Sequence, residues 1–400
     1  MNRGDRLGLG VVGLIGLVGA VWIALELRGA DRAVQRTEAG DPAALPHGPT
    51  EVAVERIPAV EPHAAPAAST GAEWTRRNQL GIEALRAGKF AEAIEHFEAC
   101  RLAEPDEPVF AGNLAEALAR LAIAEYAERE TRNSAIAHLA RAVELAPART
   151  DLSTLLERWR KTAETEDGYW TDETEHFSLS FDGSRSELMH GTGPLTEELE
   201  RAYQDYGELF GHFPVEEGSP KIEVVLYRRA EFRELTGLGH WAGGAFDGVV
   251  RIPVEDLGTE RRALIETARH ELVHAYVAAL GARSIPAWLN EGLAQWLAPA
   301  AGGRALAVQR ARTTLADGQL FPLSDLQSTI AAWDDDGKIR RAYAQSLAFV
   351  AWLHDWYGER LSFELVMGAA EGKTVADTFQ AKLFLNLEDV LGDLAADLVK

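Results

Sequence analysis

Cysteine is almost absent from this chain of 400 residues, which contains Cys100 alone. A single cysteine excludes an intrachain disulfide, and it gives no indication of the redox compartment. Apolar residues make up 46% of the sequence, which is ordinary for a globular protein and sufficient for a core. Because the chain is too long for one ordinary domain, we expect two folded units with additional segments.

Basic residues are scarce in comparison with acidic ones. The chain has 40 Lys and Arg against 62 Asp and Glu, a formal net charge of -22, and most of the acidic excess lies in residues 167–400. Such a surface repels a phosphate backbone, so we expect no nucleic-acid partner. The acidity is otherwise typical of a well-solvated surface.

Charge is missing entirely from Leu7 to Leu25. About 20 apolar residues suffice to cross a bilayer as a helix, so we predict a transmembrane signal anchor over residues 7–27 after a short stub, residues 1–6. The sequence ELRGADR after the run is a poor match to a signal-peptide cleavage site. Arginines lie on both sides of the run, so the distribution of positive charge gives little indication of the orientation in the membrane. A short stub before a large body favours a single-pass protein whose body lies outside the cytoplasm, in the periplasm or at the cell surface.

Proline is concentrated in residues 28–72, in the stretches DPAALPHGPT and EPHAAPAAST. Prolines spaced in this way prevent both a continuous helix and a packed core. We therefore predict an extended linker that holds the body away from the membrane.

Helical periodicity fills residues 73–166. Small and apolar residues recur there at the spacing of a tetratricopeptide repeat: Leu80, Gly81, Ala84, Ala93, Phe97, Cys100 and Pro105, then more loosely Leu114, Ala135, Leu139, Ala142 and Pro147. The second copy carries extra residues, AERETRN among them, and DLSTLLERWRKT predicts a capping helix. The segment resembles a short tetratricopeptide module, which implies a protein partner or substrate; a plain helical hairpin domain without a ligand is the alternative.

The pattern changes from Tyr169 onward. HFSLSF, KIEVVLY and GGAFDGVVRIPV each predict a strand, and GPLTEELERAYQDYGELFGHF predicts an amphipathic helix. Helices dominate from Thr259 to the end. We therefore predict an α+β fold, with residues 167–400 forming a mainly helical domain with a small N-terminal sheet, preceded by the all-α repeat module and a single transmembrane helix.

The stretch HELVH, from His270 to His274, is expected on a helix. Successive helical residues turn by about 100°, so the two histidines lie one turn apart on one side and can bind one metal ion. Glu271 lies farther round the axis, within reach of a water on that ion. On the opposite side Ile265 and Ala279 belong to a predicted apolar stripe that packs on a core.

A third ligand is expected from IPAWLNEGLAQW. Catalytic zinc takes three protein ligands and keeps one position open. Glu291 lies on the next predicted helix, whose first turn Pro286 suits, and Gly292 allows two helices to come close. Since the connection is short, His270, His274 and Glu291 predict a site for one Zn²⁺ per chain.

HELVH followed by WLNEGLA resembles the gluzincin zinc metallopeptidases, and more closely the peptidase MA-like domains that often follow tetratricopeptide repeats. The resemblance implies that His270, His274 and Glu291 are zinc ligands and that Glu271 is the general base. It also matches Tyr343 to a tyrosine that donates to the oxyanion. A tyrosine merely packed in an amphipathic helix is the alternative for this position.

The sequence departs from the gluzincin pattern at two places. The thermolysin type has an acidic residue four positions after the ligand glutamate, where this chain has Gln295, so the partner of a ligand histidine is unidentified. GGAFDGVVRIPV takes the place of the substrate-binding edge strand but lacks the glutamate motif that holds a free amino terminus, so we expect internal cleavage. Asp247 is either a substitute anchor or a turn aspartate, and His354 is expected to pair with Asp355 or Glu359.

These observations predict a membrane-anchored zinc peptidase that acts on a protein or peptide substrate. One alternative is a catalytically silent peptidase-fold scaffold in a cell-envelope complex. The complete ligand set and Glu271 argue against it, because a scaffold has no need of a base. A metal hydrolase that acts on a non-peptide bond is a third possibility.

Overall fold

The computed structural model describes residues 62, 71–126, 128–215, 219–238, 243–282, 285–299, 302–328, 330, 333 and 335–400. The predicted stub and transmembrane anchor (residues 1–27), and nearly all of the predicted linker, lie outside this part of the chain. Within it, no helix combines the length and apolar character needed to cross a bilayer. The anchor at residues 7–27 therefore stays a prediction.

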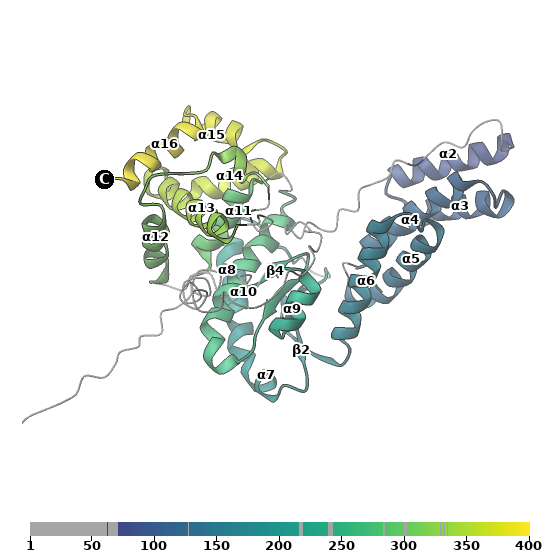
Figure 1. Cartoon of the computed structure of the whole chain (residues 1–400), viewed down its shortest axis with the longest axis horizontal. Coiled ribbons are helices and arrows are strands. Elements are labelled where there is room, and N and C mark those ends of the chain that lie inside the picture. The colour runs from purple at the N-terminus through teal and green to yellow at the C-terminus, as the bar shows by residue number, and fades with distance from the viewer. Residues whose placement is uncertain are drawn as a thin grey trace, which may run out of the picture.

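The N-terminal module is helical, and each helix packs against the next along the chain (Figure 1). Its elements are α2 (Ala72–Arg86), α3 (Phe90–Ala103), α4 (Pro108–Tyr126), the 3-10 turn η2 (Arg129–Thr131), α5 (Arg132–Leu145) and α6 (Thr150–Thr165). Gly81 lets α2 and α3 approach closely, because a Cβ atom there would lie 2.6 Å from the Phe97 ring. Leu80, by contrast, is exposed. The tetratricopeptide assignment stays a prediction.

A five-stranded sheet follows, in the order β1-β2-β3-β5-β4. The strands are β1 (Tyr169–Glu173), β2 (Phe177–Asp182), β3 (Ile222–Tyr227), β4 (Ala245–Phe246) and β5 (Val250–Pro253). The central strands β2, β3 and β5 are parallel, and the edge strands β1 and β4 are antiparallel to their neighbours. The prediction of one strand for GGAFDGVVRIPV is wrong. The segment is a β4–β5 hairpin, because Gly248 takes a φ of +91° that ends the first strand in a turn.

The two faces of the sheet have different partners. Leu179, Val224 and Val250 belong to the main core with α8 (Gly193–Phe210) and α10 (Leu257–Ala279). On the other face, Val225 and Tyr227 form a smaller apolar cluster with α9 (Arg229–Thr236). Helix α6 also contacts α9, so the helical module lies on the side of the sheet away from α10.

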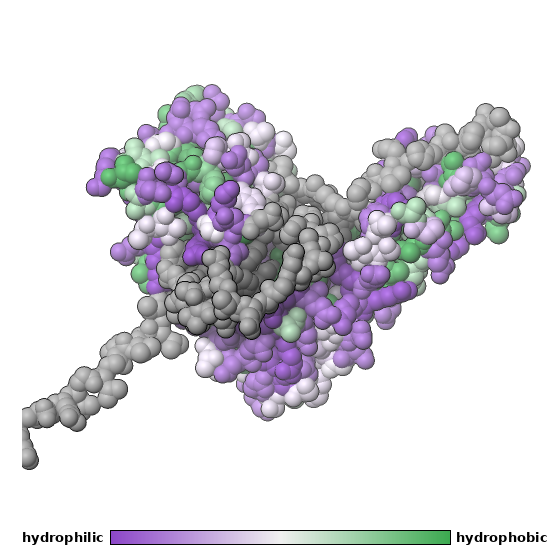
Figure 2. Space-filling model, viewed as in Figure 1, coloured by the Kyte–Doolittle hydropathy of each residue, from purple (hydrophilic) through white to green (hydrophobic). Residues whose placement is uncertain are grey.

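The remaining elements are helical and make up most of the second unit. They are α7 (Ser186–Gly191), α11 (Ala287–Leu297), α12 (Gly303–Thr314), the 3-10 turn η3 (Leu323–Leu326), α13 (Asp336–Tyr357), α14 (Arg360–Ala370), α15 (Val375–Leu383) and α16 (Leu387–Leu398). A mainly helical unit with a small sheet confirms the α+β prediction. Figure 2 shows hydrophilic residues over much of the described part of one face, in keeping with the acidic composition.

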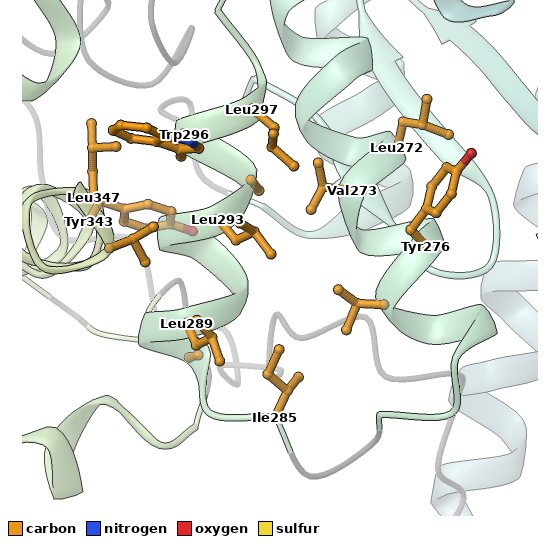
Figure 3. Close-up of a cluster of buried hydrophobic side chains, with 14 of the residues drawn as sticks. Leu272, Val273, Tyr276, Ile285, Leu289, Leu293, Trp296, Leu297, Tyr343 and Leu347 are labelled. Atoms are coloured by element: carbon orange, nitrogen blue, oxygen red, sulfur yellow. The ribbon is translucent and has the colours of Figure 1, made fainter. Parts of the chain in front are cut away.

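Helix α10 is more deeply embedded than the sequence predicts. Leu272 is fully buried, but of the predicted stripe Ile265 is only partly buried and Ala279 is exposed. Burial instead extends to several sides of the helix, because α8, the sheet and α11 all pack against it. Figure 3 shows α10, α11 and α13 side by side with leucine side chains between them. The HELVH segment therefore lies inside the molecule, between a helical layer and the sheet.

Candidate metal centre

Two helices bring three metal-ligating side chains together. Helix α10 places His270 and His274 one turn apart, with ring centroids separated by 4.9 Å. Helix α11 supplies Glu291, whose Oε2 atom lies 3.3 Å from Nε2 of His270 and 3.7 Å from Nε2 of His274. One ligand atom from each residue lies within 4.8 Å of the other two. The structure thus places all three predicted ligands at one point.

The spacing of these atoms fits a zinc ion. With zinc–ligand bonds of about 2.0–2.2 Å, neighbouring ligands of a tetrahedral site are about 3.4 Å apart. Oε2 of Glu291 is buried and has no hydrogen-bond partner. A buried carboxylate oxygen without a partner is costly, and a cation between it and the imidazoles would satisfy it. The donor set of two imidazoles and one carboxylate is therefore suited to zinc.

The charges of the three side chains support one another. Burial would raise the pKa of Glu291, but the adjacent His274 and His270 hold it below its usual value. Burial would lower the pKa of His270, but the neighbouring Glu291 and Glu271 carboxylates together outweigh this and raise it. His274 keeps a lowered pKa, chiefly because it is buried. The carboxylate is thus held ionised and one imidazole is held neutral, which are the forms that bind a metal.

Asn290 orients one of the imidazoles. Its Oδ1 atom lies 3.0 Å from Nδ1 of His274, which donates the hydrogen bond and leaves Nε2 directed at the cluster. This is the histidine partner that the sequence left unidentified. Gln295 serves another purpose, because its Nε2 donates to the main-chain oxygens of Glu291, at 3.2 Å, and Tyr343, at 3.1 Å. The position of Asn290 directly before the ligand glutamate was the available signal.

Glu271 lies beside the ligands and close to the sheet. Its side chain is 6% exposed, and burial raises its pKa to about 7, with a further increase from the charge of Glu291 and a decrease from His270. Gly244, just before β4, lies directly against it. A Cβ atom at Gly244 would be 2.7 Å from both Oε1 of Glu271 and Cγ2 of Thr267. The start of the hairpin therefore forms one wall of the site.

Tyr343 completes the group from α13. Its hydroxyl lies near the Glu291 carboxylate, and burial, followed by the charges of Glu291 and Glu271, raises its pKa well above the usual value. Figure 3 shows its hydroxyl directed toward α11. The side chain is thus both packed in its helix and in contact with the site, and it stays protonated. Its role toward a substrate stays a prediction.

Gly292 brings α13 to the site. The sequence predicted that this glycine lets two helices come close. In the structure it approaches α13, because a Cβ atom there would lie 2.4 Å from the main-chain oxygen of Ser346. Ser346 lies one turn after Tyr343, so this close contact also determines how near Tyr343 comes to Glu291.

Two weaker candidates lie outside the site. Nε2 of His354 is 2.8 Å from Oγ of Ser362, and its ring packs edge-on against Trp296. The predicted pairing with Asp355 or Glu359 is therefore wrong. The carboxylate of Asp247 accepts hydrogen bonds from the amide of Val249 and from Arg251, as a turn aspartate does.

The fold and the cluster define the class: an α+β protein with a mainly helical body and a His₂Glu centre formed by two adjacent helices. Residues 237–396 match the family model of the Peptidase MA superfamily, so this chain contains a peptidase MA-like domain. The matched segment includes the three ligand candidates, Glu271 and Tyr343. Members of that superfamily are generally zinc-dependent. A search of curated proteins gives no match to the chain.

Proposed function

We propose that this chain is a membrane-anchored, zinc-dependent peptidase of the gluzincin type that cleaves proteins or peptides internally. The observation that carries the proposal is the buried, unpartnered Oε2 atom of Glu291, held 3.3 Å and 3.7 Å from two imidazole nitrogens. The match of residues 237–396 to the Peptidase MA superfamily supports the reaction class. The body lies outside the cytoplasm, and the helical module recruits a protein partner or the substrate.

The side chains of the site have distinct roles in this reaction. Zinc, when bound by His270, His274 and Glu291, polarises the scissile carbonyl and makes water a stronger acid. Glu271 accepts a proton from the attacking water as the carbon–oxygen bond forms, and it returns this proton to the leaving amine as the carbon–nitrogen bond breaks. Tyr343, which stays protonated, donates a hydrogen bond to the oxyanion.

The hairpin supports a peptide substrate. Strand β4 lies at the end of the sheet, and Gly244 before it contacts Glu271. An extended peptide that pairs with such an edge passes beside the base. The hairpin carries Asp247 in its turn, where Arg251 neutralises it, and this favours binding in the middle of a chain over capture of a free amino terminus.

The test uses the full-length chain in detergent. We expect one zinc per chain by elemental analysis and cleavage of an unfolded protein. Glu271→Gln should keep the zinc and lower the rate by about 10²–10⁴-fold. Tyr343→Phe should keep the zinc and lower kcat by about 10²–10³-fold. Tyr357→Phe, at the end of the same helix, is the matched control and should be active.

Two outcomes would contradict the proposal in different ways. A chain that takes up no zinc removes the metal centre. A chain that binds zinc but cleaves no protein or peptide favours the catalytically silent scaffold.

A further inference from the structure

Buried and partly buried charged and polar side chains join the helical module to the sheet, on the face away from α10. We call them the interface cluster: Arg132, Glu166, Glu223, Tyr227, Asp247 and Arg251. Arg132 and Glu166 belong to the module, and the other members belong to β3, β5 and the hairpin turn. Buried charges are costly unless they are paired, so the charges that one unit contributes to this cluster depend on the charges that the other unit contributes.

Arg251 lies on β5 of the hairpin. It is 5% exposed, and its Nε atom donates to the Asp247 carboxylate at 2.9 Å and 3.1 Å. Its Nη1 atom donates to the hydroxyl of Tyr227 and, at 3.4 Å, to Oε1 of Glu166. The hydroxyl of Tyr227 donates in turn to Glu166. Of the three acceptors around this guanidinium, Tyr227 lies on β3, Asp247 lies in the hairpin turn, and Glu166 comes from the module.

Glu166 lies between two arginines. Directly after α6, it accepts from Arg251 on one side, and its Oε2 atom is 3.8 Å from Nη1 of Arg132 on the other. Arg132 also donates to both carboxylate oxygens of Glu223 on β3. Arg132 begins α5 immediately after η2, within the extra residues that interrupt the second predicted repeat. The insertion therefore contributes to the contact with the sheet.

A short path connects this cluster to the candidate metal centre. In the β4–β5 hairpin the residue paired with Arg251 is Ala245. Ala245 is preceded by Gly244, and the backbone of Gly244 lies against Oε1 of Glu271. Strand β4 pairs with β5 through only two residues, Ala245 and Phe246, so little else in the sheet holds it. A displacement of Arg251 would therefore move its paired residue Ala245, and with it Gly244, whose backbone lies beside Glu271.

We infer that Glu166 and Arg251 are positioning residues: the helical module holds the β4–β5 hairpin, and thereby the backbone beside Glu271, in place. The effect on catalysis rests on the proposed peptidase function, whereas the effect on the hairpin does not. Without the charge of Glu166, Arg251 remains buried with one carboxylate in place of two, and the short strand β4 opens more often. The module is then part of the substrate site as well as a recruiting element.

The first measurement is hydrogen–deuterium exchange on the full-length chain. Glu166→Gln should speed the exchange of amides in residues 244–253 by about 5- to 30-fold. Exchange in the ligand-bearing part of α10 should not change. Glu164→Gln is the matched control, because it removes an acidic side chain that is 78% exposed, two residues before Glu166. Glu166→Asp keeps the charge, and it should restore most of the protection.

The second measurement is kinetic. For an extended peptide, Glu166→Gln should raise KM by about tenfold without changing the zinc content. The KM of the Glu164→Gln variant should equal that of the wild type. Hairpin exchange equal to that of the wild type would overturn the inference, and so would faster exchange with an unchanged KM. If the wild-type chain neither binds zinc nor cleaves, the proposed function fails, and the exchange measurement still decides whether the module holds the hairpin.

Discussion

Oδ1 of Asn290 accepts a hydrogen bond from Nδ1 of His274 at 3.0 Å, one residue before the candidate ligand Glu291. One turn of α11 therefore supplies a carboxylate to the cluster and also fixes the ring of a histidine on α10. The relative position of two helices and the tautomer of one imidazole depend on the same pair of adjacent residues.

Asn290→Ala should weaken zinc binding by about 10–100-fold, because the His274 ring loses the acceptor that orients it. The measurement is a competition titration with a chromophoric chelator. Asn290→Asp is the conservative comparison, since it retains an acceptor at the same place and should bind zinc nearly as well as the wild type. Equal affinities for the wild type and Asn290→Ala would show that the hydrogen bond has no part in metal binding.

Gly292→Ala should destabilise the protein by about 1–3 kcal/mol, because the new Cβ atom would meet the Ser346 main-chain oxygen at 2.4 Å and force α11 and α13 apart. Urea denaturation of the purified chain measures the change. Gly392→Ala in α16 is the matched control: nothing lies within 4 Å of a Cβ there, so it should stabilise by up to about 1 kcal/mol. Similar effects of the two substitutions would refute the close helix contact.

His354 should make the protein less stable in acid. Burial, with a smaller contribution from Arg304, lowers its pKa to about 4 from the usual 6.5. Between these two values the unfolded chain binds a proton that the folded chain does not. The stability contributed by the neutral side chain is therefore complete above about pH 6.5 and is lost as the pH falls toward 4.

Urea denaturation at pH 7.5 and pH 4.5 tests this expectation. His354→Gln removes the titrating group, so the difference in unfolding free energy between the two pH values should shrink by about 2–3 kcal/mol. His190→Gln, at an exposed position, should leave that difference unchanged. An equal pH dependence in His354→Gln and the wild type would contradict a buried neutral histidine.

The ligand set could be predicted from the sequence because it depends on local geometry. Two histidines four residues apart share one side of any helix, and the connection from His274 to Glu291 is short. Tyr343 could be named only through the resemblance, since its place at Glu291 depends on the Gly292 contact between helices distant in sequence. Asn290 was missed because a hydrogen bond between α10 and α11 has no periodic signal.

The hairpin and the interface cluster were harder to predict from the sequence than the ligand set. In GGAFDGVVRIPV the turn aspartate was one of the two interpretations of Asp247, but the strands on either side, Ala245–Phe246 and Val250–Pro253, are too short to show a pattern of their own. The distant partners of Arg251 are Glu166, before the first strand, and Tyr227, on a parallel neighbour. Pairing between buried charges of this kind is set by tertiary structure, so the paired residues have no regular spacing in the sequence from which the pairing could be predicted.

The parallel pairing of β3 with β5 has a practical consequence for recombinant work. A fragment trimmed to residues 237–396 would lose β3 and leave one side of β5 without its ladder of backbone bonds. A fragment that starts at residue 167 would keep the sheet but bury the Arg251 guanidinium without Glu166. Expression of a soluble, correctly folded product therefore calls for a start before α2, so that the whole helical module, with Glu166 at its end, is made together with the sheet.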